Sequence, residues 1–279
     1  MTIQRDAKGF SLIEMMVSMA IGMVLMVAIA QLFYGNRQTA AIQDQAARMQ
    51  ETARYAIQIL QKEVRMAGFR RTESTGTFDA ANPMITGVNA FAGPPAAPNG
   101  SDEVTVRYWG SDNGAGTAAD NSVFDCIGNA VRLNERVVDR FHIANNATGE
   151  PSLYCQNTNF GTGVVTDNEL VPGVESMQIL AGVDTDADKS PNKYIPWNDA
   201  SMNLDQVLTL RISFLLRTDD GITQATDSNK YNHFGLAYAP SNVAPAGDAG
   251  AVFNQAGAAL DRRIRRLYST TITIRNRVN

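Results

Sequence analysis

The stretch FSLIEMMVSMAIGMVLMVAIAQLFY, residues 10–34, decides how this chain is organised. Its one charged residue is Glu14, and the uncharged, mostly apolar run from Met15 to Tyr34 has the length, about 20 residues, that a helix needs to cross a bilayer core. The polar segment before it, residues 1–9, carries Arg5 and Lys8. By the positive-inside rule, these charges place residues 1–9 in the cytoplasm and the rest of the chain outside.

The order of signals differs from that of an ordinary secretory signal peptide, which has a shorter apolar core followed by a small-residue cleavage site. Here the small residue, Gly9, precedes the apolar run, and no such site follows it. Glu14 needs its own explanation, because a carboxylate within an apolar span costs about 2.5–3.5 kcal/mol on insertion scales. Either a partner neutralises Glu14, or the residue lies at the headgroup boundary.

The six residues Gly9-Phe10-Ser11-Leu12-Ile13-Glu14 resemble the class III signal of type IV prepilins and pseudopilins. The resemblance implies that a prepilin peptidase cuts between Gly9 and Phe10. Phe10 then becomes the N-methylated new N-terminus, and Glu14 becomes the fifth mature residue, with a role in filament assembly. Residues 1–9 are accordingly predicted to be a leader peptide.

From Gly35 the chain turns polar but keeps a helical period. One apolar stripe comprises Ile42, Met49, Ala53, Ile57, Leu60, Val64 and Ala67. Polar and charged residues, namely Arg48, Glu51, Arg54, Gln58, Lys62 and Glu63, are predicted to occupy the other faces. No proline interrupts residues 10–67, and Gly68 is a suitable C-cap. We predict one long helix with a transmembrane, filament-core half (10–35) and an amphipathic half (36–68).

The rest of the chain, residues 69–279, is predicted to be a β-rich periplasmic domain, so the fold class is α+β, a long helix packed on a mainly antiparallel sheet. Strand candidates are Val104–Tyr108, Arg136–Ile143, Ser152–Cys155, Glu175–Leu180, Val207–Leu216 and Tyr268–Arg275. Residues 72–100 are predicted to form a long loop. Residues 219–259, rich in Asn, Ala and Gly, are predicted to form a surface excursion with little pattern.

Further motifs resemble PilW-like minor pilins of type IV pili. They are Leu60–Phe69, the turn Gly182–Asp188 with the strand after it, and the C-terminal segment Arg262–Asn279. The resemblance implies a subunit that helps to initiate or tip a pilus. Implied partners are other minor pilins, the major pilin, the inner-membrane assembly platform and, where the system has one, a large tip adhesin. The implied location is the inner membrane before assembly, and the periplasm and pilus fibre after it.

Two alternatives stay open. A J-type pseudopilin of a type II secretion system carries the same signal and has a similar role in a pseudopilus. A membrane-tethered periplasmic binding domain is the second alternative, and Glu14 argues against it, because a simple anchor has no use for a charge there.

The chain has two cysteines, Cys126 and Cys155. In an exported domain, such a pair predicts one disulfide rather than two buried free thiols. The formal net charge of −4 argues against nucleic-acid binding. The local basic cluster Arg262, Arg263, Arg265 and Arg266 is predicted to be a solvated face or to have intramolecular ion-pair partners.

Enzymatic chemistry is not indicated. The sequence has no P-loop, HExxH, GxSxG or strand-linked GxGxxG motif, and neither of its two histidines, His142 and His233, has a nucleophile context. Asp184, Asp186 and Asp188 alternate as in loops that bind calcium, but Lys189 and Ile195 stand where an EF-hand loop has glycine and glutamate. A solvated acidic turn is the alternative to a calcium site, and no other cofactor is expected.

Overall fold

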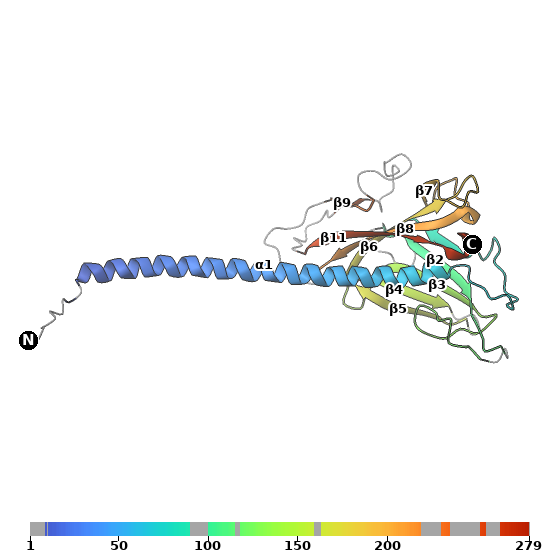
Figure 1. Cartoon of the computed structure of the whole chain (residues 1–279), viewed down its shortest axis with the longest axis horizontal. Coiled ribbons are helices and arrows are strands. Elements are labelled where there is room, and N and C mark those ends of the chain that lie inside the picture. Colours follow the sequence, from blue (N-terminus) through green and yellow to red (C-terminus); the bar gives the residue numbers. More distant parts are fainter. Residues whose placement is uncertain are drawn as a thin grey trace, which may run out of the picture. The chain divides into compact units, whose positions relative to one another are not determined.

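The computed structural model describes residues 9, 11–89, 100–114, 118–158, 163–218, 230–234, 252–254 and 263–278 (Figure 1). The chain divides into two units, residues 1–47 and 48–279. The second unit contains two main antiparallel sheets, a further two-stranded sheet and the later turns of a long helix, α1. The predicted α+β class, with a long N-terminal helix packed on mainly antiparallel sheets, is confirmed.

Helix α1 runs without interruption from Leu12 to Met66, as the absence of proline predicts (Figure 1). Gly68 lies two residues after the last helical residue, and its φ of 75° is the left-handed conformation typical of a glycine after a helix C-terminus. The space beside Gly68 is also filled, since an added Cβ would lie 2.8 Å from the Met84 sulfur. The predicted C-cap is therefore confirmed.

The buried face of α1 belongs to the same hydrophobic core as the inward-facing residues of both sheets. The stripe residues Met49, Ala53, Leu60 and Val64 are buried, as predicted. One assignment is wrong, because Glu63 was expected on an outward face and is 1% exposed. Its position follows from the helical period: Leu60, Glu63, Val64 and Ala67 have the spacing of a single helix face.

The first sheet has five antiparallel strands in chain order, β1-β2-β3-β4-β5. Their bounds are β1 Ile85–Val88, β2 Glu103–Trp109, β3 Arg136–Asn145, β4 Pro151–Thr158 and β5 Val165–Pro172. The register of β4 against β5 shifts between Leu153 and Tyr154, where the ladder is irregular. This sheet carries Cys155 on β4.

The second sheet has four antiparallel strands in the order β11-β8-β6-β7. Their bounds are β6 Val174–Val183, β7 Lys193–Pro196, β8 Val207–Arg217 and β11 Arg265–Thr273. Every residue of β6 is buried, so this central strand is covered on both faces. Short elements complete the described chain: the 3₁₀ turn Leu204–Gln206, a two-stranded sheet of β9 (Lys230–Asn232) and β10 (Val252–Asn254), and the terminal helix α2 (Arg275–Val278).

The two main sheets meet at Trp197, which follows the edge strand β7. A Cβ added to Gly87 on the edge strand β1 would lie 2.0 Å from the Trp197 ring, so the indole rests directly on the glycine backbone. Any larger residue at position 87 would force the ring away. This contact explains why a glycine stands inside a strand.

All six predicted strands are present, each within a few residues of its expected bounds. The prediction of a loop over residues 72–100 is wrong at β1, and β5 and β7 were not predicted. The expected excursion at residues 219–259 falls largely outside the described residues, but its described parts form β9 and β10 and place His233 in a buried position.

Candidate functional site

The candidate site for processing and assembly is the N-terminal end of α1. Gly9 is exposed, and nothing lies within 4 Å of where its Cβ would be. Phe10 lies outside the described residues. Ser11 and Glu14 form a reciprocal cap: the Ser11 N–H donates to Glu14 Oε2 at 2.9 Å, and the Glu14 N–H donates to Ser11 Oγ at 3.3 Å. Ser11-x-x-Glu14 is thus a capping box, which the S-x-x-E pattern of the sequence indicates.

The first turns of α1 are apolar on every side. Its large side chains from Leu12 to Tyr34 are all more than half exposed within the single chain, from 53% at Val17 to 78% at Leu12. Helix α1 is long and apolar enough over this part to cross a membrane. Such a surface requires lipid or other apolar helices around it.

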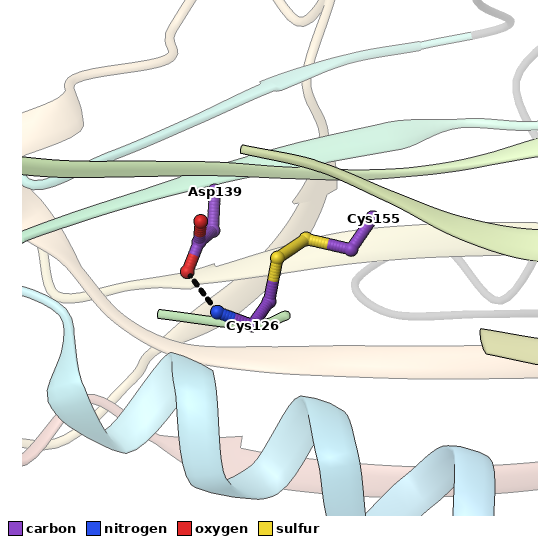
Figure 2. A group of neighbouring side chains, drawn as sticks. All are labelled: Cys126, Asp139 and Cys155. Carbon is purple, nitrogen blue, oxygen red and sulfur yellow. Dashed lines mark hydrogen bonds between the residues drawn. A yellow bond between two sulfur atoms is a disulfide. The ribbon is translucent and has the colours of Figure 1, made fainter. Parts of the chain in front are cut away.

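The predicted disulfide joins Cys126 and Cys155, with the two Cα atoms 6.5 Å apart. It ties the segment before β3 to β4 of the five-stranded sheet. Figure 2 shows that Asp139, on β3, lies beside the bridge, with its Oδ2 accepting a hydrogen bond from the Cys126 N–H at 2.9 Å. Because both cysteines are oxidised, they offer no thiolate to a metal beside Asp139.

The acidic turn brings one carboxylate oxygen each of Asp184, Asp186 and Asp188 within 4.8 Å of one another. Asp184 accepts hydrogen bonds from the backbone N–H groups of Asp186, Ala187 and Lys189. Desolvation acts to raise the pKa of Asp184, but these hydrogen bonds together outweigh it and lower the pKa. Lys189 has a φ of 67°, the left-handed conformation for which an EF-hand loop uses glycine. The calcium site stays a prediction.

Both histidines are buried. The His142 ring is fully buried, with its Nε2 3.4 Å from Asp167, and burial lowers its pKa. The His233 ring lies between the hydroxyls of Ser213 and Ser176, each 3.1 Å from a ring nitrogen, and burial lowers its pKa to about 3. Of these five side chains, Asp167 is partly exposed, and the other four are buried.

The basic cluster near the C-terminus has intramolecular partners, one of the two outcomes predicted for it. Arg263 pairs with Glu150, and Arg265 pairs with Glu175. Arg266 is exposed, and Arg262 lies outside the described residues. This cluster therefore stabilises the domain rather than presenting a continuous basic surface.

A second feature that sequence reasoning missed is a group of buried acids. The Tyr108 hydroxyl on β2 lies 2.7 Å from Glu63 on α1 and 3.0 Å from Asp139 on β3. Glu63 and Asp139 are 45 and 31 residues from Tyr108 in sequence, so no local pattern connects them. The usable signal was the position of Glu63 on the apolar face of the helix.

Comparison with known families gives two matches. Residues 140–276 match the family model of type IV pilus-assembly protein W, and residues 4–30 match the prokaryotic N-terminal methylation motif. The first match begins within β3 and extends past β11, and the second covers the capped start of α1 with most of its apolar turns. No curated protein matches the chain.

Proposed function

We propose, from the premise that this chain is a PilW-like type IV pilin, that it acts as a minor pilin that helps to start or tip the filament. The observation that carries this proposal is the union of two parts in one chain. A prepilin-type signal precedes a helix whose first turns are apolar on every side. The later turns of the same helix belong to a β-rich domain. We assign it a structural rather than an enzymatic role.

Processing and location follow from the same premise. The chain enters the inner membrane once, with residues 1–9 in the cytoplasm, and its domain faces the periplasm. A prepilin peptidase removes residues 1–9, and Phe10 is N-methylated. The helix then passes from lipid into a bundle of similar helices, which gives its apolar turns the second environment they need.

Its partners in this proposal are other minor pilins, the major pilin and the inner-membrane assembly platform, with a large tip adhesin where one exists. The domain after Gly68 is large for a subunit repeated along a whole filament, which favours a position at one end. We also propose that the leader peptide ends at residue 9, the transmembrane half of the helix at residue 35 and the amphipathic half at residue 68.

The test is a deletion of the gene combined with quantitative proteomics of sheared filaments. A minor pilin is expected far below the major pilin in abundance, and its deletion should sharply reduce surface pili. Abundance comparable with that of the major pilin would contradict the assignment. If the deletion abolishes protein secretion and leaves pili intact, the chain is a J-type pseudopilin. If the deletion affects neither secretion nor pili, the assignment becomes the tethered binding domain.

A further inference from the structure

Three polar side chains meet inside the domain where a hydrophobic core is expected. Glu63 of α1, Tyr108 of β2 and Asp139 of β3 are each at most 1% exposed, and we call them the buried acid cluster. The Tyr108 hydroxyl lies at its centre, 2.7 Å from Glu63 Oε2, 3.0 Å from Asp139 Oδ2 and 2.9 Å from the Phe124 carbonyl oxygen. The cluster thus joins the helix, two strands and the segment held by the disulfide.

If both acids are ionised, the cluster has too few hydrogens for its short oxygen–oxygen contacts. A tyrosine hydroxyl carries one hydrogen and two lone pairs, whereas a carbonyl and a carboxylate only accept. Three oxygens within 3.0 Å of the hydroxyl would then share a single hydrogen. A proton on Glu63 or Asp139 supplies a second donor toward the tyrosine oxygen, so that only two acceptors, the other acid and the Phe124 carbonyl, share the tyrosine hydrogen.

The two acids differ in the number and kind of their other contacts. Asp139 accepts from the Asn157 side chain at 2.6 Å and from the Cys126 N–H at 2.9 Å. The other oxygen of Glu63 faces the Lys62 ammonium at 3.0 Å, and that lysine is 58% exposed. A further charged neighbour is Asp125, which repels a charge on Glu63.

The electrostatics agree with the geometry. Burial first, and then the charge of Glu63, raise the pKa of Asp139 to about 7 against hydrogen bonds from Asn157, Cys126 and Tyr108. Burial likewise raises the pKa of Glu63, against the charge of Lys62. Burial and both acids raise the pKa of Tyr108, so its hydroxyl keeps its proton throughout. Since the acids interact, the protons belong to the pair rather than to either residue.

A small polar pocket lies next to residues that contact the cluster. Its volume is about 30 Å³, which is room for a water molecule, and it is lined by Asp125 and by Asn157, the donor to Asp139.

We propose that the buried acid cluster is a pH-sensitive latch, which holds the last turns of α1 on the five-stranded sheet while Glu63 and Asp139 share a proton and loosens when both ionise. The sign follows from linkage. An acid whose folded-state pKa is raised contributes stability that is complete below its unfolded pKa, about 4, and is lost as pH rises through the folded value near 7. The latch is therefore closed in acid and opens toward alkaline pH.

The experiment measures melting temperatures of the full chain in detergent micelles from about pH 5 to about pH 8.5, for wild type and for Glu63→Gln. A glutamine keeps a permanent donor toward Tyr108 and does not ionise. The melting temperature of wild type minus that of the variant should fall by about 5 °C or more across this range. The difference profile is required because His142 and His233, with lowered pKa values, give the opposite trend in both proteins.

Glu51→Gln is the matched control, since Glu51 lies on the same helix, is exposed and pairs with Arg54. The melting temperature of wild type minus that of Glu51→Gln should not change with pH. If the melting-temperature difference between wild type and Glu63→Gln also does not change with pH, the proposal is overturned. If Glu63→Gln does not fold, infrared difference spectra of wild type decide instead. A protonated carboxylic acid that disappears near neutral pH supports the latch, and the absence of such a band at about pH 5 overturns it. Neither measurement depends on which filament the chain joins.

Discussion

Arg265 on β11 donates two hydrogen bonds to Glu175 on β6, at 2.5 and 3.0 Å, although β8 lies between the two strands. Both side chains are buried. Glu175 also pairs with Arg217 of β8, and Arg217 and Arg263 converge on Glu150. The sheet is therefore clamped at one end by charges spread over three strands.

Removing one member of a buried pair leaves the other charge in the core, at a cost of about 3–5 kcal/mol. We predict that Glu175→Gln lowers the free energy of unfolding by about 3 kcal/mol or more in chemical denaturation. The control is Glu135→Gln, which breaks the exposed pair with Arg132 and should cost less than about 1 kcal/mol. Equal costs for the two variants would show that the clamp adds nothing beyond a surface pair.

The disulfide gives the second prediction. Its cysteines are 29 residues apart, and the chain-entropy estimate for a loop of that size is about 3–4 kcal/mol. Reduction, or the double variant Cys126→Ser/Cys155→Ser, should lower the free energy of unfolding by that amount. Peptide mapping without reductant should recover the two cysteines linked. Alkylation of both thiols in unreduced protein would refute the bridge.

Much of this fold could be predicted because its signals are local. The uninterrupted helix, its apolar half and the alternating strands β8 and β11 all follow from the spacing of apolar residues. By contrast, β5 reads Val-Thr-Asp-Asn-Glu-Leu-Val-Pro and is mostly exposed at the edge of its sheet. A strand of that composition is fixed by its pairing with β4, which no local pattern reveals.

The site was predictable in part for the same reason. Gly9, Phe10 and Glu14 lie within six consecutive residues and carry a recognisable signal, whereas the buried acid cluster needs three distant segments to meet. Glu63 was assigned to solvent because it is charged, although its helical position placed it inward. Residue type was given more weight than periodicity, and the burial of this acid depends on partners that only the tertiary structure supplies.

The third prediction concerns the acidic turn. The calcium hypothesis predicts that calcium at about millimolar concentration raises the melting temperature of the wild-type chain and has no effect on Asp186→Ala. Asp186 contributes its side chain to the cluster, while its backbone N–H, which donates to Asp184, survives the substitution. Asp184→Ala should lower the melting temperature without calcium as well, because it removes the acceptor for three backbone N–H groups. If calcium leaves wild type unchanged in calorimetry, the segment is an acidic turn alone.

The fourth prediction separates the two roles that Glu14 can have. In the single chain, Glu14 caps α1 through the Ser11 N–H. In the assembly role that we propose, it meets the amine that cleavage creates on Phe10 of a neighbouring subunit, a group with a pKa near 8 in model peptides. A charge pair is worth far more in an apolar layer than in water, so this contact would fix the axial register of the subunit. Glutamine keeps the capping hydrogen bond and loses the charge.

We therefore expect Glu14→Gln and Glu14→Ala to be cleaved and retained in the membrane, yet recovered with filaments at least about tenfold less than wild type, which corresponds to about 1.4 kcal/mol. Ser11→Ala keeps the charge and removes only the hydroxyl that caps the Glu14 N–H, so it should assemble normally. Gly9→Leu should block cleavage, because the peptidase needs a residue without a bulky side chain before the scissile bond. Immunoblots of membrane and sheared-filament fractions measure all four variants. Normal assembly of Glu14→Gln, with loss only in Glu14→Ala and Ser11→Ala, would assign Glu14 to helix capping and remove the charge from the mechanism.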